Sequence, residues 1–321
     1  MIDFRYHIVS IIAVFLALSL GLFLGSTTLQ STVTHNLQAQ AHTVTARNQT
    51  LRAANDRLST VARDQRAFLA GIAPYAAQNR LSGASAALVS APGVSSDYVA
   101  AMGTVLAQAG ATVTATVQLQ SAYFDPTQDA ELGGLATQLK LPGHPLPVGS
   151  GSTESSAELA AVLTARPGRK AVAKTDVEAV LSALADGKFI TVDGDPPTHA
   201  ATLAVLLVPA PSATTSLQTA QTQNAVLLAL ANQLRKTTTG LVVGGQTADP
   251  TVANGMLAAV EADAGLRKAV STVDFGSSEA DPDQTAGRIA VVLALAATPS
   301  GKPGSYGLGG SPPVPSASTS P

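Results

Sequence analysis

The side chains of this sequence that could bind a metal ion are few and widely spaced. Its 321 residues include three methionines and no cysteine. Without cysteine, the chain has no thiolate metal site, disulfide or cysteine nucleophile. Met102 and Met256 lie far apart in segments with helical patterning, so we expect both to fill the core. The five histidines are His7, His35, His42, His144 and His199.

His35 and His42 form the best pair of candidate ligands. A separation of seven residues places both on one helix face, but about 10 Å apart along the axis. Metal–ligand bonds are only about 2 Å long. In a parallel pair of helices the two side chains would point outward, so we interpret them as solvated positions and predict no metal ligand in this chain.

A second possible cluster joins Asp193 and Asp195, across Gly194, with His199 shortly after. Two carboxylates at the end of a strand suit a hard cation, because sites in open α/β sheets lie there. Asp-Gly and Asp-Pro are also common turn sequences. We favour the turn.

The sequence contains no recognisable motif for nucleotide binding or catalysis. The candidate phosphate turns are Ala91-Pro92-Gly93 and Gly244-Gly245. Neither completes G-x-G-x-x-G or G-x-x-x-x-G-K-[ST], and no G-x-S-x-G or H-E-x-x-H occurs. The sequence therefore predicts no catalytic residue, no cofactor site and no enzyme, and an enzyme at the sheet's switch point is the least supported alternative.

Composition limits the partners. The net charge is −2 and only 12% of residues are charged, so there is no basic footprint for nucleic acid. Trp is absent and aromatic residues make up 4%. The core must therefore be built from small aliphatic side chains.

The element around which the chain is organised is the uncharged stretch 8–29, IVSIIAVFLALSLGLFLGSTTL. Its length, roughly 33 Å as a helix, exceeds a bilayer core of about 30 Å. The alternative is a cleaved signal peptide, but the apolar run is long and no A-x-A-like site follows it. We therefore predict a retained transmembrane helix. Small residues recur at a spacing that favours helix pairing: Ala13, Ala17, Gly21 and Gly25.

The flanking charges predict the orientation. Arg5 precedes the span, and the next basic residue is Arg47. Because positive charge stays in the cytoplasm, residues 1–7 should form a cytoplasmic tip. We therefore expect a single-pass plasma-membrane protein with the bulk of the chain outside the cytoplasm.

Residues 30–70 should continue the span as a helical coiled-coil stalk, ended by Gly71 and Pro74. Weaker or polar positions alternate with the main apolar series, so the seam is imperfect. We predict a parallel homodimer; a single helix packed on its own domain is the alternative. The main series falls at heptad spacing: Leu37, Val44, Leu51 and Leu58.

Residues 80–298 alternate short apolar runs with helical segments, which predicts an extracytoplasmic, Rossmann-like α/β domain with a largely parallel sheet. The Pro/Gly/Ser-rich tail 299–321 should be disordered, or anchored only near Tyr306. We expect strands at 86–90, 112–117, 189–192, 203–208, 240–243 and 270–273. The expected helices are 96–109, 127–139, 154–165, 175–186, 216–236, 250–263 and 284–297.

Two segments at the ends of the sequence are distinctive: MIDFRYHIVSIIAVFLALSLGLFLGSTTLQ and STVDFGSSEADPDQTAGRIAVVLALAATPSGKPGSYG. Both resemble the corresponding ends of the actinobacterial MctB-type copper transport family. The layout of tip, span, stalk and α/β domain also fits, over about residues 1–307. The resemblance implies a role in copper efflux or homeostasis and an association with the mycobacterial outer membrane.

Two functions follow from this reading. The resemblance implies copper transport, although copper(I) favours Cys and Met ligands and copper(II) favours imidazoles, which this chain does not gather. Strands of about five residues, apolar on both faces, also do not fit an outer-membrane barrel. The alternative is a non-transporting dimeric scaffold or regulator of envelope or septum assembly, with a cell-envelope protein as partner.

Overall fold

The computed structural model describes residues 4–169, 171–211, 214–246, 255–275, 284–298, 303–307 and 314–315. Within the first helix, the side chains of residue 5 and of residues 26–39 lie outside this description. The chain divides into two compact units, Met1–Gln65 and Arg66–Pro321.

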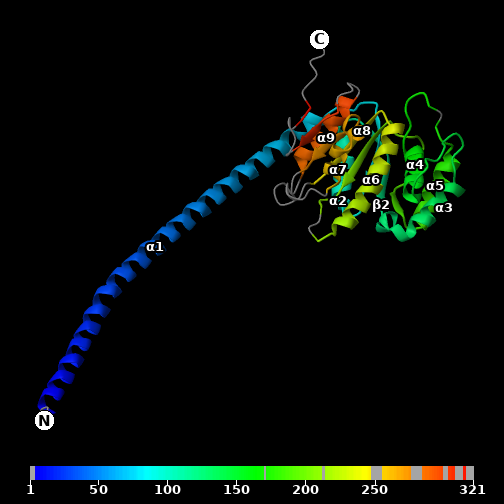
Figure 1. The fold of residues 1–321 in the computed structure, drawn as a ribbon. Coiled ribbons are helices and arrows are strands. Elements are labelled where there is room, and N and C mark those ends of the chain that lie inside the picture. Colours follow the sequence, from blue (N-terminus) through cyan, green and yellow to red (C-terminus); the bar gives the residue numbers. More distant parts are fainter. Residues whose placement is uncertain are drawn as a thin grey trace. The chain divides into compact units, whose positions relative to one another are not determined.

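Helix α1 (Phe4–Ala77) contains the whole of the predicted span and stalk (Figure 1). The prediction that Gly71 and Pro74 end this helix is wrong, because Pro74 lies inside it. A proline this close to the C-terminus removes few helical hydrogen bonds. Two buried residues just beyond it, Ala77 and Leu81, hold this end of the helix in a core.

Seven strands form one sheet in the order β3-β2-β1-β4-β5-β6-β7. Every neighbouring pair is parallel except β2 and β3, which are antiparallel. This order is Rossmann-like, and the predicted α/β class with a largely parallel sheet is confirmed. The strands are β1 (Ser85–Ser90), β2 (Thr112–Leu119), β3 (Ile190–Asp193), β4 (Leu203–Val208), β5 (Gly240–Gly245), β6 (Ser271–Asp274) and β7 (Ser305–Gly307).

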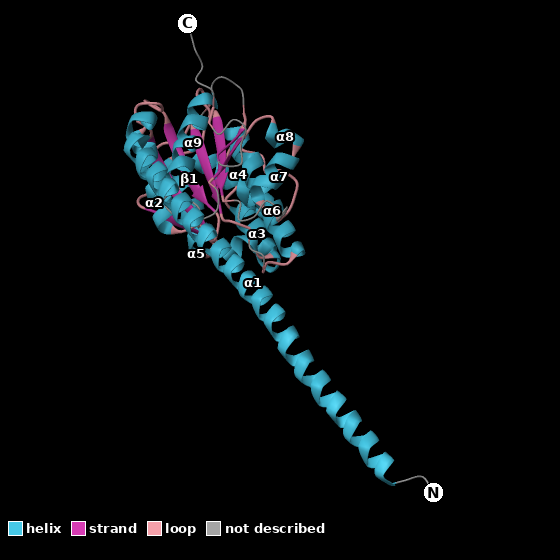
Figure 2. Ribbon diagram, turned by 90° about the vertical axis from the view of Figure 1, so that its left-hand side faces the viewer, coloured by secondary structure: helices cyan, strands magenta, loops and turns pink. Residues whose placement is uncertain are grey.

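Helices cover both faces of the sheet, as Figure 2 shows for the magenta strands among cyan helices. Helices α2 and α9 pack on one face with α1's last turn, and α4 to α8 line the core of the other. The helices are α2 (Ser96–Gln108), α3 (Asp129–Gln138), α4 (Gly151–Leu163), α5 (Lys174–Asp186), α6 (Leu217–Thr237), α7 (Met256–Ala262), α8 (Ala264–Arg267) and α9 (Thr285–Ala297), with 3-10 turns at Ser121–Phe124 and Pro126–Gln128.

The alternation of side chains along each strand builds the two cores. In β1, Ala86 and Leu88 face the α2/α9 side, whereas Ala87 and Val89 face the other. All six residues of β4 are buried, as expected for a central strand with helices on both faces.

Part of the tail belongs to the sheet. Ser305–Gly307 is strand β7, which pairs in parallel with β6, and Tyr306 is buried at 8% exposure. The prediction of disorder from residue 299 onward is therefore wrong for this segment, and the alternative anchor at Tyr306 is confirmed. The rest of the predicted tail lies outside the described residues, apart from 303–304 and 314–315.

Candidate functional site: the exposed helix and the metal-ligand candidates

Within α1, Tyr6–Gly25 is long and apolar enough to cross a membrane, with a mean hydropathy of 2.6 and none of the stretch buried. The hydroxyl of Ser19 donates to the carbonyl of Phe15 at 2.7 Å, so this polar group is satisfied within the helix. The span contains each of the small residues predicted to pair helices: Ala13, Ala17, Gly21 and Gly25.

The small-residue face is open to a partner. A Cβ atom added at Gly21 or Gly25 would meet no atom within 4 Å. Such a face allows two helix backbones to approach closely in a bilayer. The geometry therefore permits the predicted pairing through these residues, and no described residue of the chain covers the two glycines.

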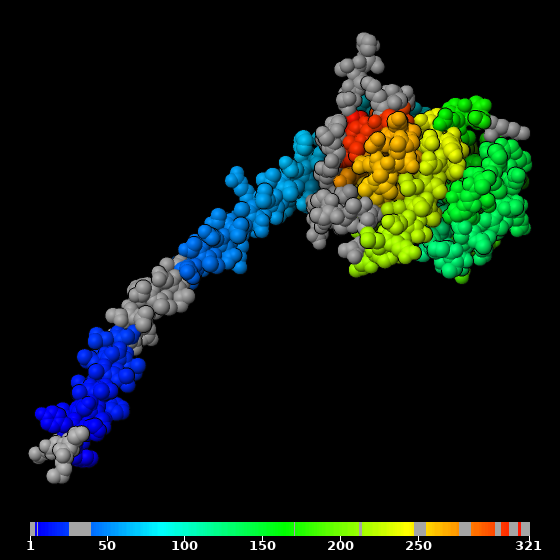
Figure 3. Space-filling model, in the orientation of Figure 1, coloured from blue at the N-terminus to red at the C-terminus, as the bar shows by residue number. Residues whose placement is uncertain are grey.

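The heptad series beyond the span is exposed. Val44, Leu51 and Leu58 are 57%, 63% and 66% exposed, and Figure 3 shows the helix around them with its side chains uncovered. The fourth predicted residue, Leu37, has its side chain outside the described set. Large apolar side chains at heptad spacing are typical of helices that pair, so the predicted coiled coil stays a prediction.

The candidate metal ligands do not meet. Met102 on α2 and Met256 on α7 are both buried, in cores on opposite faces of the sheet, so their predicted role as core residues is confirmed. His42 is exposed on α1, and the side chain of His35 is not described. Among the described residues, no group of three or more His, Cys, Asp and Glu side chains could hold a metal ion.

The Asp193–His199 segment is a turn, as favoured from its sequence. Asp193 ends β3, and Gly194 adopts φ +80°, a conformation that suits glycine. The Nδ1 atom of His199 lies 3.0 Å from the hydroxyl of its neighbour Thr198.

The switch point of the sheet lies between β1 and β4, where a dinucleotide site would be expected. The prediction that Gly244 and Gly245 follow their strand is wrong, because both belong to β5. A Cβ at Gly244 would collide with the ring of Phe275, and one at Gly245 with the side chain of Val208. Close packing accounts for these glycines without a phosphate.

Sequence reasoning missed two buried polar sites on α4. The hydroxyls of Tyr123 and Ser156 lie 3.0 Å apart, and Glu158, two positions further along the helix and therefore on another face, is 2% exposed. Burial raises the pKa of Glu158 to about 7. The segment SSAELAAVL could have indicated a buried carboxyl, because helical spacing places Glu158 on the same face as apolar residues.

A known family model matches nearly the whole chain. The family described as "Copper transport outer membrane protein, MctB" matches residues 1–314. The chain belongs to the MctB family. Its relatives include proteins named "Copper transporter MctB" from Mycobacterium tuberculosis (strain CDC 1551 / Oshkosh) and Mycobacterium leprae (strain TN).

The match to these MctB proteins extends over the full layout. The M. tuberculosis protein is 28% identical over 300 residues, covering 92% of each chain. The M. leprae protein is 29% identical over 322 residues, covering 96% of this chain and 97% of the relative. The family match over residues 1–314 includes both the apolar N-terminal helix and the α/β domain.

Proposed function

We propose that this MctB-family chain acts in copper transport or copper homeostasis at the cell envelope, as a single-pass plasma-membrane protein that pairs through α1. The observation that carries the proposal is one helix with two successive surfaces: an apolar span, then the exposed heptad residues Val44, Leu51 and Leu58. In this arrangement residues 1–7 lie in the cytoplasm and the α/β domain lies outside.

Copper enters this proposal as the transported substrate. The described residues offer no cluster that fits a copper ion, since the two described methionines are buried and separate. We therefore assign the chain an indirect, non-catalytic part, in which the paired helix presents the α/β domain to an envelope partner protein. The same observation favours a second candidate, a scaffold for envelope or septum assembly with no connection to copper.

Growth in copper separates the two candidates. A strain of the native host without this protein should become copper-sensitive and recover with the wild-type chain. Leu51→Glu/Leu58→Glu should fail to restore growth, because charges on the seam oppose helix pairing. Ala53→Glu/Thr60→Glu, which carries the same charges outside the seam, should restore it. Unchanged copper tolerance in the deletion strain would reject the copper role and leave the scaffold.

A copper titration tests whether the chain acts without binding copper itself. Calorimetric titration of the full chain in neutral detergent should show no saturable site for either copper(I) or copper(II). Saturable sub-micromolar binding that disappears on replacing His or Met residues would instead make the chain a direct copper carrier. In the growth experiment, the amount of each variant in the membrane is measured as the control for expression.

A further inference from the structure

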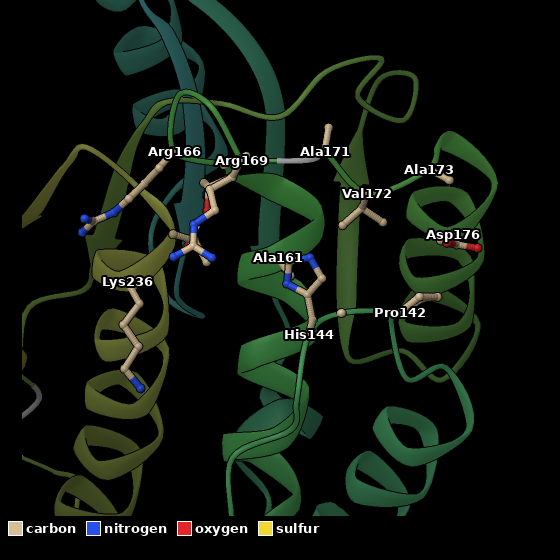
Figure 4. Close-up of a pocket in the computed structure, with 14 residues that line it drawn as sticks. Pro142, His144, Ala161, Arg166, Arg169, Ala171, Val172, Ala173, Asp176 and Lys236 are labelled. Atoms are coloured by element: carbon tan, nitrogen blue, oxygen red, sulfur yellow. The ribbon is translucent and has the colours of Figure 1, made fainter.

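A second feature of the α/β domain is a cavity of about 550 Å³ where α4 and α6 end and α5 begins (Figure 4). Its basic side chains come from separate parts of the chain: the loop after α4 supplies Arg166 and Arg169, and α6 supplies Lys236. His144, from the loop after α3, lines the middle of the cavity. Figure 4 shows these basic groups on one side and Asp176 on the other.

The local fold fixes the position of these cations. The hydroxyls of Thr164 and Thr237 lie 2.6 Å apart and join the ends of α4 and α6. Arg166 donates to the carbonyl of Arg235 at 3.0 Å, near the C-terminus of α6. Basic groups stabilise the negative end of a helix, so the positions of Arg166 and Lys236 have a structural reason as well.

The position of Arg169 is not explained by a helix C-terminus in this way. Its guanidinium makes no hydrogen bond or ion pair with any residue that the structure describes. In the same set, no carboxylate lies within 4.0 Å of Arg166, Arg169 or Lys236, and the ion pair nearby joins Lys174 and Glu178. Three exposed cations and one carboxylate, Asp176, therefore line the cavity without an ion pair in the described part of the chain, and the ammonium of Lys236 donates to Oε1 of Gln233 at 3.3 Å.

The start of α5 adds hydrogen-bond donors on the side of the cavity opposite the basic side chains, together with the acidic Asp176 of its first turn. Its N-cap is Ala173, which has no side-chain oxygen to accept from the first turn, and Ala173 lines the cavity. Backbone N–H groups and the helix dipole at such an end favour an anion. Asp176, in the same first turn, opposes this effect with its own negative charge.

We propose that this cavity binds a small anion carrying a phosphate monoester. A monoester has a charge of about −1.5 to −2 at neutral pH, which matches several cations better than a single carboxylate does. Arginine pairs with phosphate through two parallel hydrogen bonds. Cavities of roughly 300 to 1,000 Å³ hold small ligands.

Matched ligands test the proposal and identify the source of the phosphate. The full chain in neutral detergent is titrated by calorimetry with glycerol 3-phosphate and, as the uncharged control, glycerol. The full chain in phosphatidylcholine nanodiscs is then floated with phosphatidylcholine vesicles that do or do not contain phosphatidic acid. We expect saturable binding of one phosphate ligand per chain and none of glycerol.

Arg169→Gln should weaken phosphate binding about tenfold or more, because it removes a charge-assisted hydrogen bond. Lys236→Gln should weaken it as well, whereas Lys268→Gln, an exposed cation on the end of α8, should leave it unchanged. Binding of glycerol 3-phosphate supports a free phosphorylated ligand, and binding confined to phosphatidic acid vesicles supports a lipid headgroup. The absence of binding in both formats, or equal losses in Arg169→Gln and Lys268→Gln, would overturn the proposal.

Discussion

The carboxyl of Glu158 is buried in the α/β domain and has a strongly raised pKa. Its Oε1 atom accepts the backbone N–H of Leu141 at 3.3 Å, whereas Oε2 has no hydrogen-bond partner among the described residues. Desolvation raises its pKa from 4.5 to about 7 and outweighs both that hydrogen bond and the charge of Lys140. Between about pH 4.5 and pH 7, the folded chain therefore retains a proton on Glu158 that the unfolded chain releases.

This difference predicts a pH dependence of stability. Because the folded pKa is the higher one, the contribution of Glu158 is fully present below pH 4.5 and is lost as the pH rises through about 7. Glu158→Gln should remove this dependence and gain about 2–3 kcal/mol relative to wild type between pH 4.5 and pH 8. Urea unfolding of the full chain in neutral detergent at both pH values measures the gain. The exposed control Glu131→Gln should show no such difference, and a pH-independent effect of Glu158→Gln would contradict the assignment.

Gly244 carries a second prediction at the residue scale. A methyl group there meets the ring of Phe275, so Gly244→Ala should destabilise the domain by about 1–3 kcal/mol, the usual cost of overpacking. Gly103→Ala, in the middle of α2 with no atom within 4 Å of the added Cβ, should be neutral or stabilising. Thermal unfolding followed by circular dichroism compares the two variants. Equal melting temperatures would show that Phe275 moves aside without cost.

At the scale of the elements, the absence of cysteine makes the pairing of α1 directly testable. In a parallel coiled coil, identical seam positions of the two helices face each other. A single Leu51→Cys chain should therefore form a disulfide-linked dimer in membranes on mild oxidation, within the Cα separation of about 4.4–6.8 Å that a disulfide requires.

Ala53→Cys is the matched control, since it lies two residues away on the same helix but outside the seam. It should cross-link far less than Leu51→Cys. Ala17→Cys examines whether the small-residue face in the membrane continues the same interface. Equal cross-linking at positions 51 and 53 would indicate random collision and not a specific parallel dimer.

The elements also show what the sequence can specify. The central strands β1, β4 and β5 were predicted because each is an apolar run buried on both faces, and β2 and β3 because apolar residues recur along them. Strand β7 was missed, since Ser305–Gly307 has no apolar run and exists through its pairing with β6. Helix α4 begins at Gly151, earlier than predicted, because the carboxylate of Asp129 accepts its first N–H groups from a distant part of the chain.

The candidate sites also divide into those formed by a local pattern and those formed by long-range contacts. The exposed heptad residues could be predicted because they all lie on one helix, so that their spacing alone places them on one face. The proposed phosphate cavity could not, because Arg169 and Lys236 line one cavity only after α4 has packed against α6. Chemistry that is assembled by long-range contacts leaves no local pattern to read.

At the scale of the whole molecule, the proposed function depends on which side of the membrane the α/β domain lies. The apolar span Tyr6–Gly25 has a basic residue, Arg5, at its N-terminal side, and the next one is Arg47. This asymmetry favours a cytoplasmic N-terminus. An envelope partner and an external phosphate ligand both require the domain to lie outside.

Labelling of single cysteines in intact cells decides the orientation. Ala53→Cys should react with a membrane-impermeant maleimide, because residue 53 follows the span on the external side, whereas Phe4→Cys should react only after the cells are broken. Both residues are exposed on α1, so protection by the fold does not explain a difference between them. Adding lysines after the span while replacing Arg5 should reduce labelling at position 53, since the charge bias is then reversed. Labelling of Phe4→Cys in intact cells would place the α/β domain in the cytoplasm and reject the envelope role, while leaving the phosphate pocket to be tested against cytoplasmic ligands.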